Sequence, residues 1–148
     1  MDIIKKQSTG DSTPDCYTLN SMNANPVYHV NVNAKVEYLG NQSLPASQRY
    51  VFSYTITLHN RGTVAAKLLT RHWLITDADG RTEEVSGAGV VGEHPYLQPG
   101  ESYTYTSGSL LKTPVGAMQG FYTMLADDST EFKANIKPFT LAIPGSLH

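Results

Sequence analysis

Hydrophobic and polar residues alternate with a period of two along most of this chain. The clearest case is residues 50–58, where one phase is aromatic and aliphatic and the other is serine, threonine and histidine. Such alternation is the pattern of a strand with one buried and one exposed face. We therefore predict a strand here, central to one sheet and ended by the turn-forming residues Asn60 to Gly62.

Other segments with the same period predict the remaining strands. They lie at residues 32–38, 68–76, 82–85, 103–106, 118–125 and 132–143. Residues 68–76 are apolar in both phases, which predicts burial on both sides for part of their length, and Asp77 to Gly80 supply a hairpin turn. Pro138 interrupts the last segment and marks an edge or a bulge, because proline cannot donate to a strand ladder.

The predicted fold class is all-β. No helical stripe with a cap is present, and seven to eight short strands at regular spacing are typical of an antiparallel β-sandwich of the immunoglobulin or fibronectin type III-like class. The fibronectin-like form is the closer comparison, because Cys16 is the single cysteine and no internal disulfide can form. Trp73 is the candidate core anchor.

Composition divides the chain and limits its function. Residues 1–25 are rich in serine, threonine and asparagine and are predicted to be a mobile arm in which Cys16 is a bystander rather than a nucleophile, while residues 26–148 are predicted to form one sandwich domain. A net charge of −2 lacks the basic excess of a nucleic-acid binder. No apolar stretch predicts membrane insertion, and one cysteine fits a cytoplasmic location.

The glycine-rich stretch that begins at Gly87 superficially matches a dinucleotide fingerprint, with Gly89 and Gly92 at the expected spacing. Pro95 and Pro99 follow, so the helix that would hold a pyrophosphate cannot form there. The first interpretation is structural: the glycines permit positive φ or close packing where a strand bends into a loop. The alternative is that exposed loop amides form a nest for phosphate or a nucleotide.

Histidine and aspartate side chains raise a second hypothesis, divalent metal binding. His72, His94 and Asp77 would offer imidazole and carboxylate ligands suited to cobalt if the fold brought them together. Their spacing does not require it, and the main expectation is that no cofactor is bound, with Mg²⁺ or Co²⁺ as the alternative. Alternation places His72 on the face opposite Arg71 and Trp73.

Surface chemistry offers a third hypothesis. Tyr96, Leu97 and Tyr103 cluster near prolines and form either a partner surface or core plugs at one end of the sandwich. An edge strand, at residues 32–38 or around Pro138, would allow pairing into a homodimer.

Several motifs, in order, resemble the ApaG family. They are Tyr50-Val-Phe-Ser-Tyr-Thr-Ile, Leu69-Thr-Arg-His-Trp-Leu-Ile-Thr-Asp, the stretch from Gly87 to Glu101, Tyr105-Thr-Ser-Gly and Thr113-Pro-Val-Gly-Ala-Met-Gln-Gly. The resemblance covers residues 27–148 and implies a fibronectin type III-like sandwich associated in bacteria with cobalt and magnesium efflux, and related domains look like protein-binding modules. Catalytic motifs are absent from the sequence. We therefore expect a non-enzymatic interaction or accessory module with a protein partner and an indirect role in cobalt and magnesium homeostasis.

Overall fold

A computed structural model describes residues 2–5 and 27–145 of the chain. Its helical structure in these ranges is limited to two short 3₁₀ turns, η3 (Gly40–Gln42) and η4 (Pro45–Ser47), and it contains no helix long and apolar enough to cross a membrane. The strands are β1 (Asp2–Lys5), β2 (Val30–Tyr38), β3 (Tyr50–Asn60), β4 (Ala66–Asp77), β5 (Thr82–Ala88), β6 (Tyr96–Leu97), β7 (Ser102–Leu111), β8 (Val115–Ala126) and β9 (Glu131–Ala142).

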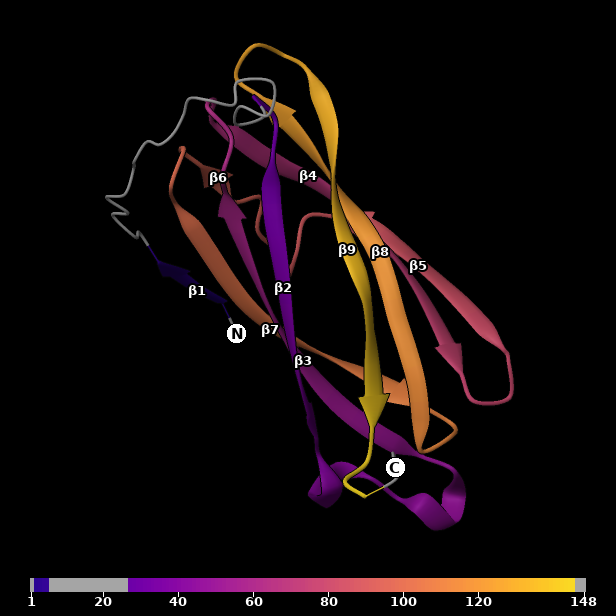
Figure 1. The fold of residues 1–148 in the computed structure, drawn as a ribbon. Coiled ribbons are helices and arrows are strands. Elements are labelled where there is room, and N and C mark those ends of the chain that lie inside the picture. The colour runs from indigo at the N-terminus through magenta and orange to yellow at the C-terminus, as the bar shows by residue number, and fades with distance from the viewer. Residues whose placement is uncertain (1, 6–26, 146–148) are drawn as a thin grey trace.

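The strands form two antiparallel sheets that pack as a sandwich (Figure 1). One sheet has the order β1-β7-β3-β2, and the other has the order β5-β4-β8-β9, with β6 also paired to β4. The all-β sandwich predicted from the alternation is confirmed. The strand at residues 50–58 is internal to its sheet as predicted, because β7 and β2 pair with the two edges of β3.

The core lies between the two sheets. The inward phase of β3 is buried from Phe52 to Asn60, and Trp73 from β4 is buried beside Tyr54, with ring centroids 5.4 Å apart. Trp73 therefore has the anchoring position that the sequence predicted. Asn60, at the end of β3, is a buried polar residue whose amide donates to the carbonyls of Val64 and Leu97 and accepts from the amide of Gly62.

The two sheets have their edges close together on one side of the sandwich, at β2 and β9, but not on the other side, at β5 and β7. The edge strands β2 and β9 contact each other across the sandwich, which closes that side. On the opposite side of the sandwich, β5 pairs with β4 along one edge, and no other described strand pairs with its second edge. Among the described strands, β1 alone pairs with the outer edge of β7, and it covers residues 102–105 but not residues 107–111.

Several details differ from the sequence prediction. The predicted arm includes Asp2–Lys5, which form β1 on the edge of β7, while its residues 6–25, Cys16 included, lie outside the described part. The two-residue β6 was not predicted. The interruption at Pro138 is confirmed as both edge and bulge: β9 is an edge strand, and its register against β8 shifts between Met118 and Gly120.

Candidate binding site

The glycine-rich stretch joins β5 to β6 along one edge of β4. Between them, Val90 and Glu93 exchange two backbone hydrogen bonds of 2.9 and 2.8 Å. The two residues between them, Val91 and Gly92, have φ values of 41° and 82°. Positive φ at both central residues defines a type I′ hairpin turn. The stretch is thus a miniature hairpin, fixed to the core by the fully buried Val90.

The three glycines of the predicted anion loop have different surroundings. A Cβ at Gly89, whose φ is +65°, would lie 2.4 Å from the carbonyl oxygen of Glu93. Gly92 has a positive φ with open space around it, and Gly87 packs under the side chain of Arg71. The structural interpretation, positive φ and close packing, is confirmed for these positions.

The backbone amides of this hairpin are largely engaged. The amide of Gly89 donates to the carbonyl of Leu69 at 2.9 Å, and those of Val90 and Glu93 donate to each other's carbonyls. A nest needs successive amides that point at the anion. The amides of Gly89, Val90 and Glu93 are therefore already used within the fold. Anion binding by the loop of Gly87, Gly89 and Gly92 stays a prediction.

Arg71 links the glycine stretch to β4. Its Nη1 donates to the carbonyl oxygens of Ala88 and Gly89 at 3.0 and 2.8 Å. A Cβ at Gly87 would lie 2.8 to 3.0 Å from the guanidinium atoms, so the absence of a side chain there makes room for the cation. The side chain is half-buried on the same face of β4 as Trp73.

Inward tyrosines lie close to this cation. The hydroxyls of Tyr105 and Tyr122 are hydrogen-bonded at 2.5 Å inside the sandwich. Burial raises the pKa of Tyr54 and of Tyr105, and the positive charge of Arg71 opposes that rise in both. The interior near Arg71 is therefore polar, with neutral phenols close to one positive charge.

The candidate metal ligands are spread along β4. His72 and Asp77 are five positions apart on this strand, which is about 16 Å in extended backbone. The ring of His72 stacks on Phe121, with centroids 5.0 Å apart, and its Nδ1 lies 2.8 Å from the hydroxyl of Ser86. The Nδ1 of His94 lies 3.0 Å from the carbonyl oxygen of Leu68.

The structure does not bring these three ligands together. The part of the chain that it describes contains no group of three or more histidine, cysteine or acidic side chains that could hold a metal ion. Metal binding by His72, His94 and Asp77 therefore stays a prediction. The expected orientation of His72 is confirmed, since it lies opposite the buried Trp73.

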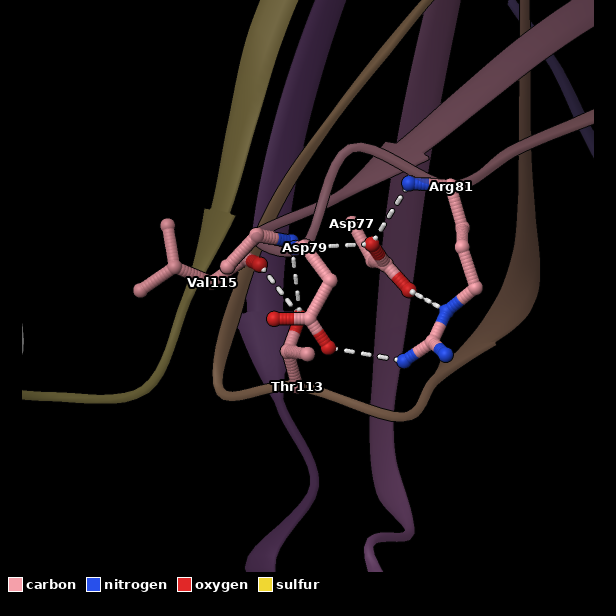
Figure 2. A network of polar contacts seen from close by, with 6 residues as sticks. Asp77, Asp79, Arg81, Thr113 and Val115 are labelled. Atoms are coloured by element: carbon pink, nitrogen blue, oxygen red, sulfur yellow. Dashed lines mark hydrogen bonds and ion pairs between the residues drawn. The ribbon is translucent and has the colours of Figure 1, made fainter.

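Asp77 instead organises the turn between β4 and β5 (Figure 2). Its carboxylate accepts from the amides of Asp79 and Arg81 at 2.9 and 3.0 Å and from the Arg81 guanidinium at 3.1 Å. Desolvation opposes ionisation, but these hydrogen bonds outweigh it and hold the pKa of Asp77 below its ordinary value. The predicted hairpin turn at Asp77 to Gly80 is confirmed.

The predicted partner surface separates into one exposed and two buried side chains. Tyr96 is 47% exposed, and its hydroxyl donates to the carboxylate of Asp127 at 2.9 Å. Leu97 and Tyr103 are 3% and 1% exposed. In this fold, Tyr96 is the member of the trio that a partner can contact, because the other two fill the core.

A groove of about 520 Å³ opens between the two unpaired edges described above. One wall is the first half of β5, and the other is formed by Gly108 to Lys112 at the end of β7. Ile75, Val85 and Leu111 give it an apolar lining. Both of its walls carry main-chain groups suited to pairing with a strand.

Sequence reasoning identified neither this groove nor Arg71 as a site. The groove arises from pairing order, which no local pattern encodes. A signal for Arg71 was present, because alternation placed it with Trp73 on the core side, where an arginine is unusual. A charged residue in the buried phase of a strand is the pattern that would have identified it.

Comparison with known proteins gives concordant results. The profile of the ApaG domain matches residues 40–126. A protein named ApaG from Thiobacillus denitrificans is 56% identical over 121 residues, covering 82% of this chain and 95% of that protein. Another from Pseudomonas putida strain W619 is 52% identical over 125 residues, covering 84% of this chain and 99% of that protein. A crystal structure of an ApaA protein from Bordetella pertussis is 42% identical, with a TM-score of 0.79 over 82% of this chain and 98% of that chain.

Proposed function

The chain belongs to the ApaG family, and from that premise we propose that it is a non-enzymatic accessory module that binds an extended segment of a protein partner. The observation that carries the proposal is the groove between β5 and the end of β7, from Gly108 to Leu111. Both walls are strand edges with no pairing strand among the described residues, and such edges bind extended peptides through main-chain hydrogen bonds.

The chain itself supplies an example of this mode of binding. β1 adds to the edge of β7 as a short antiparallel strand, with Asp2 opposite Tyr105 and Lys5 opposite Ser102. A partner segment in the groove would add to a strand edge in the same way, either to β5 or to β7 toward Leu111. Its alternate side chains would enter the apolar lining formed by Ile75 and Val85.

The physiological setting is part of the same proposal. The family resemblance associates the module with cobalt and magnesium homeostasis, to which it would contribute indirectly through its partner in the cytoplasm. A homodimer formed through an edge strand is the alternative occupant. In that case a second copy would compete with peptides for the groove.

A blocked variant tests the proposal. Because Asp2 pairs with Tyr105, an N-terminal extension of alternating threonine and valine would continue β1 along residues 107–111 and fill the groove. An extension of glycine and serine of equal length is the matched control. For peptides selected from a random library on the wild-type chain, we expect an unchanged Kd with the control and a loss of about tenfold or more with the blocked variant, measured by fluorescence anisotropy.

Equal binding to the blocked and control variants would contradict the proposal, since the selected peptides would then bind elsewhere. Failure to enrich any peptide over an unrelated β-sandwich would also contradict it. Sedimentation analysis of the same two variants tests the homodimer: a dimer that the threonine–valine extension converts to a monomer would favour a second copy as the occupant.

A further inference from the structure

We propose that Arg71 binds a carboxylate of the docked segment, so that the groove selects partners with an acidic residue four positions from an apolar one. This inference rests on the proposed function and specifies the chemistry of the partner. Arg71 is at one end of the open side of the sandwich, opposite Gly87 of β5. The groove, with its apolar side chains Ile75 and Val85, is at the other end, where Ile75 is opposite Glu83.

The first argument is charge. Arg71 is half-buried, and the ion pairs of the described residues, those of Arg81 with Asp77 and Asp79, do not include it. Its hydrogen bonds go to two carbonyl oxygens through Nη1 alone. A guanidinium has five N–H donors and favours planar, bidentate recognition of a carboxylate. The donors of Nε and Nη2 therefore remain for an anion.

The second argument is space. The position opposite Arg71 is glycine, and any Cβ there would lie 2.8 Å from Nη2. Since Gly87 does not have a positive φ, the absence of a side chain is not required by its backbone conformation. The glycine instead leaves room for the guanidinium over β5, the edge strand with which a segment would pair.

The third argument is register. Residues 87 and 83 of β5 are four positions apart on one face of an edge strand, which is about 13 Å. A segment that pairs with β5 presents alternate side chains to the same face, so two of its residues four positions apart would reach Arg71 and the lining beside Ile75. In an antiparallel segment, the acidic residue is the N-terminal one of the two.

The test compares two synthetic peptides blocked at both ends. The first is Thr-Asp-Thr-Val-Thr-Val-Thr, and the second has asparagine in place of aspartate. We expect the aspartate peptide to bind the wild-type chain about tenfold more tightly and to shift the Nε–Hε NMR signal of Arg71, which the asparagine peptide leaves unmoved. In Arg71→Gln and in Gly87→Ala, which displaces the guanidinium without removing its charge, the two peptides should bind equally.

Arg49→Gln is the matched control, because Arg49 is an exposed arginine that does not line the groove, and it should keep the full preference. Thermal unfolding followed by circular dichroism checks that every variant is folded. Arg71→Lys, which keeps a cation, should keep part of the preference.

The outcomes separate the two proposals. Equal binding of both peptides to the wild-type chain, with the Arg71 signal unmoved, would overturn the role of Arg71 and leave the proposed function in place. Binding of neither peptide would count against both. A shift of the Arg71 signal by inorganic pyrophosphate at lower concentration than by the aspartate peptide would overturn the inference in favour of a free anion.

Discussion

Three glycines that form one motif in the sequence have three separate physical roles in the fold. Gly87 leaves room for the Arg71 guanidinium, Gly89 combines positive φ with close approach to a carbonyl, and Gly92 needs positive φ alone. The sequence predicted glycine-dependent bending and packing here, because proline excludes the competing helix. It could not predict which glycine meets which atom, since those contacts come from β4 and from the turn itself.

These roles predict different costs for alanine. At Gly92, an alanine side chain would have open space, so only its left-handed backbone conformation should lower the unfolding free energy, by about 1 kcal/mol. At Gly89, the Cβ would also overlap the Glu93 carbonyl oxygen, and we expect a loss of about 3 kcal/mol. Urea unfolding of Gly89→Ala and Gly92→Ala measures both. Equal losses would contradict the assigned contacts.

At the scale of elements, the long strands were predictable and the short ones were not. β3 shows its period over eleven residues, so its existence, buried phase and end at Asn60 follow from the pattern. β6 has two residues and β1 has four, too few to show a period, and they are strands because β4 and β7 offer them an edge. The bulge at Pro138 was predictable, because proline lacks the amide that a strand ladder needs and this is visible in the sequence alone.

The close packing of β8 against β4 gives a prediction at this scale. A Cβ at Gly120 would lie 1.9 Å from the backbone carbonyl oxygen of His72, so one of the two strands must move. We expect Gly120→Ala to lower the unfolding free energy by about 3 kcal/mol. In Gly108→Ala, the nearest atom would be 3.4 Å away, and the change should stay within about 0.5 kcal/mol. A Gly120→Ala chain as stable as Gly108→Ala would contradict this packing.

At the scale of the whole molecule, the proposed binding depends on which strand edges have no pairing strand among the described residues. The sequence correctly indicated that residues 32–38 and the segment around Pro138 are edge strands, yet these two edges contact each other. Among the described strands, the edges left without a partner belong to β5 and to the end of β7, and β7 pairs with β3, which is distant from it in the chain. For the same reason, sequence reasoning grouped His72, His94 and Asp77, which the fold places at separate points along β4.

Amide hydrogen exchange tests the central claim, that the groove receives a strand, most directly. Exchange is measured on the wild-type chain, free and saturated with a library-selected peptide. A strand added in the groove should slow exchange at alternate residues of β5 or of residues 107–111, while β2 and β9 remain unchanged. Protection confined to β2, β9 or the hairpin tip at Val91 and Gly92, with β5 and residues 107–111 exchanging as in the free chain, would contradict the account.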